Sequence, residues 1–284
     1  MEVISYNIQF GRGLDGRFDL WRICDSIKGA EIICLQEVEA GWQRSGNIDQ
    51  AQAISELLPE YYAVYGSSFD ADNSYKADDG KVVNRRRQHG DMILSRWQII
   101  SSRCFNLSKT HHNDKFNMQM GFIESVIDCD TGPVRVYNIH AGYLQAAERL
   151  AQFRHLVDVY QRSPAEQGAW SGKSNINDDD WSNGRATPAM PQSAIACGDF
   201  NCPPGSAEYQ YIIENSDLSD CWQLIEPVNL NTSTLKHGKT EDIDISGKID
   251  HIFVSADLVD RVQEVTIDHQ AEGSDHMPVC CRLG

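Results

Sequence analysis

Short apolar segments bounded by turn residues recur along the whole chain. Each is rich in Val, Ile, Tyr, Phe or Cys and spans only a few residues, which is the pattern of a β-strand. We expect strands at Glu2–Ile8, Glu31–Leu35, Tyr61–Tyr65, Asp91–Leu94, Gly121–Ile127, Val134–Ile139, Ala194–Cys197, Ile249–Val254 and Val262–Ile267. Because these segments extend over nearly the full length, they favour a single α/β domain with large sheets over two separate domains.

Helical periodicity is confined to a few stretches between these strands. The longest, Leu144–Tyr160, places Phe153, Leu156 and Tyr160 on one helical stripe. Shorter helices are expected at Phe18–Ile27, Asp49–Leu58 and Ser206–Ile213.

Two polar stretches, Asp70–His89 and Ser163–Gln192, interrupt the pattern and are expected to be long surface loops. Loops longer than about 15 residues are uncommon unless they are functional or disordered. The second stretch would enter the sheet edge beside the candidate site described below. Its Trp170 and Trp181 could cover a substrate or pack onto the scaffold.

The charge balance limits the classes of partner. The chain has 25 Lys and Arg against 41 Asp and Glu, a net charge of -16. Proteins that grip nucleic acid non-specifically normally present a positive face, so this charge disfavours a nuclease acting along a long backbone. One basic cluster stands out, Arg85, Arg86 and Arg87, which is either a solvated surface or a site for a second phosphate or an anionic head group.

Cysteine usage and the N-terminus indicate the compartment. The nine cysteines show no pair of CxxC units with zinc spacing, and we expect them to be reduced and structural. The chain begins directly with strand-like residues and shows no signal peptide. Apolar runs fall far below the roughly 18 residues that a membrane span needs. The sequence therefore predicts a cytoplasmic protein without a membrane span, and it indicates no oligomeric state.

Polar residues stand repeatedly at the ends of the expected strands. Glu37 follows Ile32–Leu35 closely, and a carboxylate there would be costly inside a core unless it were paired or bound to a metal. Each such residue also has a structural interpretation: Glu37 as an exposed strand end, Asp199 as turn chemistry, and His140 as a partly buried histidine.

Taken together, these residues form a donor set. The candidates offer oxygen atoms from Asn7, Glu37, Asp199, Asn201 and Asp275, with no cysteine or paired-histidine ligand spacing. Oxygen-rich sites suit Mg²⁺ or Mn²⁺ rather than structural zinc.

Six motifs, taken in order, carry a family resemblance. They are Tyr6-Asn7, Leu35-Gln36-Glu37-Val38, Asn138-Ile139-His140, Gly198-Asp199-Phe200-Asn201, Ile249-Asp250-His251-Ile252-Phe253-Val254-Ser255 and Ser274-Asp275-His276-Met277-Pro278-Val279. This set resembles the endonuclease/exonuclease/phosphatase superfamily. The resemblance implies one domain over residues 1–284 with a four-layer αββα sandwich of two mixed β-sheets. It also implies Mg²⁺-dependent hydrolysis of a phosphoester, with Mn²⁺ as a possible substitute.

The resemblance also implies a role for each matched residue. Glu37 would ligate the principal metal, helped by Asp275 and with Asn7 nearby. Asp199 and Asn201 would orient and activate the attacking water. The remaining residues are His140, His276 and Asp250: both histidines would contact the scissile phosphate, and Asp250 would hold His276. The chain departs from the family at Gln9, where close members often have histidine, so a supporting role at that position is in doubt.

The motifs leave the substrate open, because one fold and metal site serve many phosphoesters. We expect a small or lipid-derived phosphodiester or phosphomonoester, with a DNA or RNA nuclease as the alternative. A further alternative is a catalytically silent binding protein.

Overall fold

Two six-stranded mixed sheets form the centre of the protein. They were identified in a computed structural model that describes residues 1–172, 190–225, 232–236, 239–240 and 243–284. The first sheet has the order β15 (Val262–Ile267), β16 (Val279–Leu283), β1 (Glu2–Asn7), β2 (Ile32–Ala40), β6 (Arg86–Ser95) and β3 (Tyr62–Asp72). The second has the order β11 (Ser219–Asp220), β14 (Asp250–Val254), β10 (Ala194–Asp199), β9 (Gly132–His140), β8 (Gly121–Cys129) and β7 (Ile99–Asn106).

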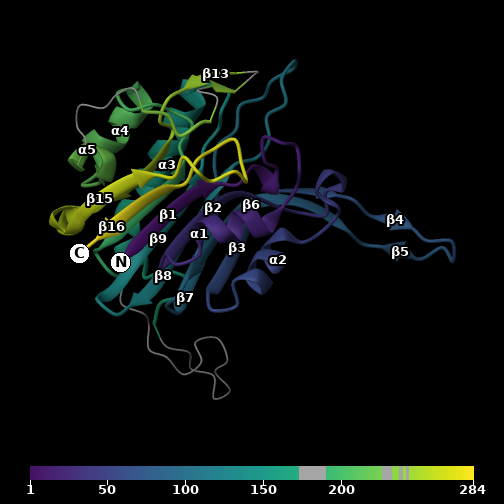
Figure 1. Ribbon diagram of the computed structural model, residues 1–284, viewed down its shortest axis with the longest axis horizontal. Helices are drawn as coiled ribbons and strands as arrows, with labels where there is room; N and C mark the ends of the chain where they lie inside the picture. Colours follow the sequence, from purple (N-terminus) through teal and green to yellow (C-terminus); the bar gives the residue numbers. More distant parts are fainter. Residues whose placement is uncertain (173–189, 226–231, 237–238, 241–242) are drawn as a thin grey trace.

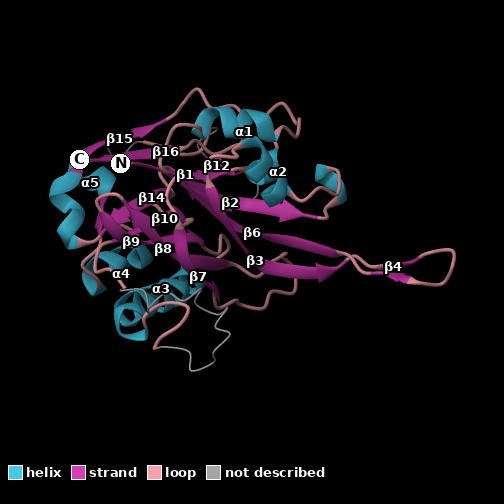
Figure 2. Cartoon of the chain, turned by 90° about the horizontal axis from the view of Figure 1, so that it is seen from below, coloured by secondary structure: helices cyan, strands magenta, loops and turns pink. Residues whose placement is uncertain are grey.

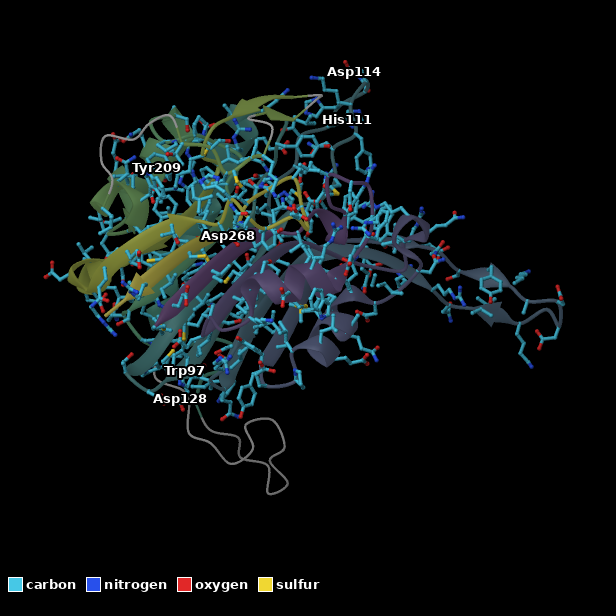
Figure 3. The ribbon with its side chains drawn as sticks, viewed as in Figure 1. Trp97, His111, Asp114, Asp128, Tyr209 and Asp268 are labelled. Carbon is cyan, nitrogen blue, oxygen red and sulfur yellow. The ribbon has the colours of Figure 1, made fainter. Side chains whose placement is uncertain are left out.

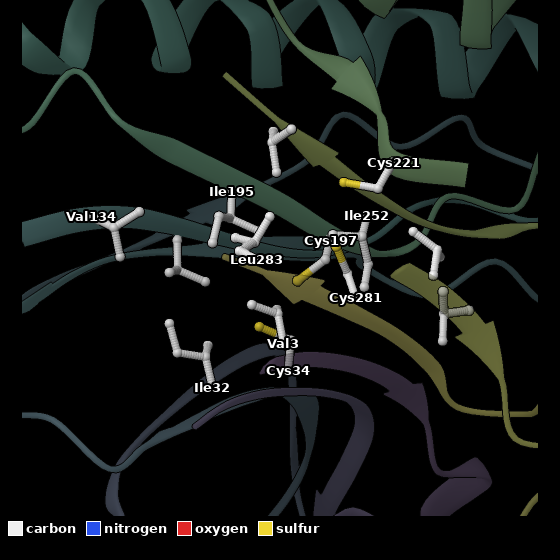
Figure 4. Close-up of a cluster of buried hydrophobic side chains, with 14 of the residues drawn as sticks. Val3, Ile32, Cys34, Val134, Ile195, Cys197, Cys221, Ile252, Cys281 and Leu283 are labelled. Carbon is white, nitrogen blue, oxygen red and sulfur yellow. The ribbon is translucent and has the colours of Figure 1, made fainter. Parts of the chain in front are cut away.

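The sheets pack face to face and helices cover their outer faces (Figures 1 and 2). Figure 4 shows side chains such as Val3 and Cys34 from the first sheet meeting Ile195 and Cys197 from the second in the apolar layer between them. Outside the first sheet lie α1 (Leu20–Ile27) and α2 (Gln50–Leu57), and outside the second lie α3 (Ala146–Glu166) and α4 (Ala207–Asn215). This arrangement confirms the predicted four-layer single-domain fold.

The helices form where the sequence supplies both a cap and an apolar face. Asp19 accepts hydrogen bonds from the backbone N–H groups of Trp21 and Arg22, and so satisfies donors at the start of α1. Asp49 caps α2 in the same way through the N–H of Gln52. Such caps replace hydrogen bonds that the first turn cannot make internally. Both helices begin within two residues of the predicted start.

Each predicted strand overlaps an observed one, but several elements were not expected. The additional elements are the strands β7, β11 and β16, the helix α5 (Cys221–Ile225), three short 3-10 segments, η1 (Gln9–Gly11), η2 (Gln43–Ser45) and η3 (Ala256–Arg261), and two small hairpins, β4 (Tyr75–Lys76) with β5 (Val82–Val83) and β12 (Lys239–Thr240) with β13 (Ile243–Ser246). β7 lies at the edge of its sheet, and half of its residues are polar. Because it lacks a clear apolar pattern, the sequence did not identify it as a strand.

The prediction of a loop at 70–89 is wrong for most of that range. β3 continues to Asp72 and pairs with the start of β6, with Asp72 opposite Arg86 and Ala71 opposite Arg87. The β4–β5 hairpin extends this ribbon further. The result is an arm, residues 70–88, that projects from the body of the sandwich (Figures 1 and 2). Pairing between β3 and β6 holds these polar residues in strands, although their sequence has no local apolar pattern that predicts a strand.

The structure also differs from the surface loop expected at 163–192. Residues 163–166 are the last turn of α3, and residues 173–189, with Trp181, lie outside the described residues. The two described ends of the stretch meet near Ser101, where Gly168 lies close to Met190. Ser193 accepts a hydrogen bond from the N–H of Arg135, at the start of β9. These ends therefore lie at the sheet edge opposite the strand ends His140 and Asp199. Trp170 follows Gly168 closely, so it cannot cover a site at those strand ends.

Figure 3 shows the two opposite ends of the sandwich, which lie across the direction in which the arm projects. Trp97 and Asp128 mark one end of the sandwich, whereas His111 and Asp114, in the loop between β7 and β8, mark the other. None of the described helices is long and apolar enough to span a membrane. All nine cysteines are free thiols, and most of them are buried.

Candidate active site

The carboxyl ends of the parallel strands meet at one edge of the sandwich. In the parallel pairs β1–β2 and β9–β10, β9 ends at His140 and β10 at Asp199. β14 runs antiparallel to β10 and starts at this edge, with Asp250 opposite Asp199. The loop before β16 adds the last two candidates. The structure thus brings together Asn7, Glu37, His140, Asp199, Asn201, Asp250, Asp275 and His276. Arg85, Arg86 and Arg87 lie on the arm and do not line this site.

A bulge in β2 turns Glu37 towards the site. The pairing of β2 with β6 shifts between Leu35 and Val38, and Glu37 adopts a left-handed backbone with φ of 60°. A non-glycine residue in this region costs free energy and persists only where the surroundings hold it. The second sheet provides that support, because Asn138 donates hydrogen bonds of 2.9 Å to the carbonyls of Leu35 and Met92.

Asn7 links two of the candidate carboxylates. Its Nδ2 donates to Glu37 Oε1 at 3.1 Å and to Asp199 Oδ2 at 3.0 Å. Its Oδ1 accepts the backbone N–H of Gln9 at 3.0 Å, so the position that departs from the family pattern still orients Asn7. The N–H of Asn201 donates to the other oxygen of Asp199 at 2.9 Å. Asp199 is therefore fixed with Oδ2 near Asn7 and the histidines.

Two buried histidines face these carboxylates. His140 Nε2 lies 3.6 Å from Asp199 Oδ2 and 4.0 Å from Glu37 Oε1. His89, on β6, lies with Nε2 4.0 Å from Glu37 Oε2. Sequence reasoning missed His89 because it falls in the stretch expected to be a loop. Its position could have indicated it, because His89 lies only two residues before the expected strand Asp91–Leu94.

Asp250 holds His276 against Asp199. His276 Nδ1 lies 2.9 Å from Asp250 Oδ2, and His276 Nε2 lies 3.8 Å from Asp199 Oδ2. Thr234, which the sequence did not suggest, accepts the backbone N–H of Asp250 at 3.2 Å. Burial opposes protonation of His276, but Asp250 and then Asp199 outweigh it and raise the pKa of His276 well above its usual value. The charged, imidazolium form of His276 is thus favoured.

The environment shifts the pKa values of the other candidates in different directions. Burial, followed by the charge of Asp250, raises the pKa of Asp199 to about 7. Burial lowers the pKa of His140 to about 4, so this imidazole is neutral. Burial also opposes ionisation of Glu37, but His89, His140 and Asn7 outweigh it and lower the pKa of Glu37. Glu37 is therefore held in its ionised form, whereas Asp199 is poised to exchange a proton.

A cavity of about 190 Å³ opens over these residues. Its polar floor is formed by Glu37, His140, Asp199, Asn201, Asp275 and His276, and its walls by Gln9, Phe10, Met118, Met120 and Tyr143. The wall residues come from η1 and from the loops after β7 and β9, which sequence reasoning did not connect with the site. The cavity offers space for a phosphate beside a small apolar or planar group.

The donor set fits a divalent cation. Burial, aided by the charge of Glu37, outweighs the opposing effect of His276 and raises the pKa of Asp275. Burial and then the charges of Glu37 and Asp199 raise the pKa of Asp91 well above its usual value. Such crowding of carboxylates leaves negative charge that a cation would neutralise, and hard cations such as Mg²⁺ prefer oxygen ligands. Asp199, Asp250 and His276 place ligand atoms within 4.8 Å of one another, but the Nδ1 of His276 is hydrogen-bonded to Asp250. Carboxylate oxygens are therefore the donors available to an ion.

A family comparison agrees with this geometry. Residues 4–276 match the model of the Endonuclease/Exonuclease/phosphatase family. The chain belongs to this family. Members of the family are hydrolytic phosphoesterases and are generally dependent on divalent metal ions. The buried acidic and histidine cluster of this family member is consistent with that dependence.

Solved structures of the family share the fold. An endonuclease/exonuclease/phosphatase from Beutenbergia cavernae is 16% identical with a TM-score of 0.66, covering 100% of this chain and 72% of its own. The mannosyl-6-phosphatase Bt3783 of Bacteroides thetaiotaomicron is 18% identical with a TM-score of 0.64, covering 100% and 99%. The 3' phosphatase NExo from Neisseria, bound to a product DNA hairpin, is 15% identical with a TM-score of 0.58, covering 100% and 99%. A search of curated protein sequences finds no significant match.

Proposed function

We propose that this protein is a phosphodiesterase that hydrolyses a small or lipid-derived phosphoester with the help of Mg²⁺, for which Mn²⁺ can substitute. The observation that carries the proposal is the placement of Asp199 between Asn7, His140 and His276, with a pKa raised to about 7. A general base is most effective when its pKa lies near the working pH. The reaction is in-line attack of water on phosphorus.

Asp199 takes the proton of the attacking water. Asn201 and Asn7 hold the two carboxylate oxygens, so the group is oriented before substrate binds. Protonation of Asp199 is favoured at this point because Asp250 repels its charge and burial desolvates it. Removal of such a base costs about 10²- to 10⁴-fold in rate.

The two histidines stabilise the phosphoryl oxygens. His276 is cationic and Asp250 fixes its ring, so its Nε2 is placed to donate to a phosphate oxygen near Asp199. His140 is neutral and donates from Nε2 on the other side of Asp199. Both side chains are buried, and charge developing on the phosphate is therefore poorly screened by water.

Glu37 and Asp275 would hold the cation, with Asn7 beside them. Glu37 is ionised and its side chain is still 20% exposed towards the cavity. A bound divalent cation supplies positive charge that polarises the phosphoryl group and stabilises the leaving oxygen. Asn7 bridges Glu37 and Asp199 by donating to both, which fixes their relative position.

The cavity supports a small substrate. Its volume of about 190 Å³ is below the range of roughly 300–1,000 Å³ typical of sites for drug-sized ligands. The net charge of -16 would also repel a long nucleic acid backbone. A cytoplasmic location remains part of the proposal.

Hydrolysis of bis-p-nitrophenyl phosphate in Mg²⁺, Mn²⁺ or EDTA tests this function, with Asp199→Asn as the matched control. We expect cation-dependent release of p-nitrophenol that Asp199→Asn reduces by about 10²- to 10⁴-fold. Near-wild-type turnover by Asp199→Asn would remove Asp199 from the proposed role. A plasmid and p-nitrophenyl phosphate in parallel separate nuclease and phosphomonoesterase activity from the small-diester reaction.

A further inference from the structure

The three consecutive arginines of the arm have different environments. Arg86 pairs with Asp70 at 2.6 Å and with Asp72 at 3.5 Å. Arg85 and Arg87 form no ion pair with any residue that the structure describes. Neighbouring side chains of an extended chain point to opposite faces, which separates these two arginines from the paired Arg86. Two guanidinium groups with unused charge therefore share one side of the arm.

Stacked arginines and aromatic rings connect this side of the arm to the catalytic cavity. The guanidinium of Arg87 lies 5.5 Å from the ring centre of Trp42. Arg44 lies between two rings, 4.5 Å from that of Trp42 and 4.0 Å from that of Phe10. Phe10 is itself a wall of the cavity over Glu37. Further out on the arm, Arg85 lies 5.2 Å from the ring of Tyr75.

We name this succession the arginine–aromatic track: Phe10, Arg44, Trp42, Arg87, Arg85 and Tyr75. Close backbone contacts hold its middle in place. Gly41 has a φ of 73°, and a Cβ at this position would lie 2.1 Å from the carbonyl oxygen of Arg86, so only glycine lets the chain before Trp42 approach the arm. Trp42 Nε1 donates to the carbonyl of Gln88 at 2.8 Å. The track is thus organised before any ligand binds.

We propose that the track binds the part of the substrate that extends beyond the scissile phosphate, and that this part is a short single-stranded oligonucleotide. Guanidinium groups pair well with phosphates, and bases stack on aromatic rings and on guanidinium planes. This inference rests on the proposed phosphodiesterase function and narrows its phosphoester to a short oligonucleotide, of which only the part around the scissile phosphate enters the cavity. A polyanionic ligand is compatible with the net charge of -16 because its electrostatic attraction to the protein is confined to the track. This confinement favours a short single-stranded oligonucleotide over a long duplex.

The tip of the arm disfavours an anionic lipid surface as the partner. Asp78 and Asp79 lie at its turn, and the exposed Lys81 beside them is paired with Asp79 at 2.7 Å. These carboxylates would meet the negative head groups first and be repelled by them. An oligonucleotide bound along the track would instead contact Arg85 and Arg87.

Binding of a fluorescein-labelled oligothymidylate in Mg²⁺, followed by fluorescence anisotropy on an Asp199→Asn background, tests the track. We expect R85Q/R87Q to weaken binding at least tenfold. We also expect the slope of log K against log salt to become shallower by about 1.4, since each phosphate contact with a single strand contributes about 0.7. Trp42→Ala should weaken binding without changing that slope.

The matched control is K81Q/R86Q, which removes two positive charges from the same arm, as R85Q/R87Q does. Both of its side chains are already paired, Lys81 with Asp79 and Arg86 with Asp70 and Asp72. It should bind like the Asp199→Asn background. Equal losses in both double variants would overturn the track, as would binding to phosphatidylserine vesicles in place of the oligonucleotide. Hydrolysis of bis-p-nitrophenyl phosphate tests the proposed function separately, so an active enzyme that ignores the oligonucleotide would refute only this inference.

Discussion

His276 is hydrogen-bonded through Nδ1 to Asp250 Oδ2 at 2.9 Å, and the Nε2 of the same ring lies 3.8 Å from Asp199 Oδ2. One imidazole thus stands between two buried carboxylates. Asp250 fixes the ring and favours its charged form, while the other nitrogen faces the carboxylate proposed as the base. The charge of Asp250 in turn helps to raise the pKa of Asp199. Asp250 therefore acts on both groups without lining the cavity.

Replacement of Asp250 should show this double action. We expect Asp250→Asn to lower kcat by about 10²- to 10⁴-fold, since the ring of His276 loses its charge partner and its preferred orientation. The pKa of His276 should fall, so the alkaline limb of the pH–rate profile should move to lower pH. A profile of bis-p-nitrophenyl phosphate hydrolysis, with circular dichroism to check folding, measures both effects. An unshifted alkaline limb would contradict the role given to Asp250.

Glu37 should control the affinity for the cation. We expect Glu37→Ala to raise the Mg²⁺ concentration needed for half-maximal activity at least tenfold, because it removes an ionised carboxylate of the site. Isothermal titration with Mg²⁺ alone provides a measurement independent of turnover. An unchanged titration would remove Glu37 from the ligands.

The stabilisation of the folded protein by a bound cation should depend on pH. Without a cation, the folded pKa of Asp199 is about 7, above its usual value of 3.8, and that of Asp275 is also raised. The folded state then holds more protons than the unfolded state above about pH 4, so the free energy of unfolding falls as pH rises towards 7. A cation needs the deprotonated ligands, and its stabilising effect should therefore grow over the same range.

Thermal denaturation with and without Mg²⁺ at about pH 5 and about pH 8 measures this difference. We expect the larger increase in melting temperature at the higher pH, and a smaller pH dependence in Asp199→Asn. An equal increase at both pH values would show that proton release from these carboxylates is not linked to cation binding.

Local sequence predicted the central buried strands and their polar ends, but it missed the sheet strands β7, β11 and β16. Asn7, His140 and Asp199 each end a segment of apolar residues, and a residue that ends a buried strand lies at the edge of its sheet whatever the partner strands are. The roles of Glu37 and Asp250 came from the family resemblance, because neither apolar periodicity nor spacing distinguishes a ligand from an ordinary surface acid.

Other features depended on contacts between distant segments. His89 belongs to the site only because β6 pairs with β2, and Glu37 faces it only because Asn138 of the other sheet supports the bulge. The arm formed where a loop was expected, since cross-strand pairing ordered its polar residues. The sequence by itself thus determined which residues end buried strands, through local burial. Tertiary structure alone decided which of them meet, because register and packing join residues that no local pattern relates.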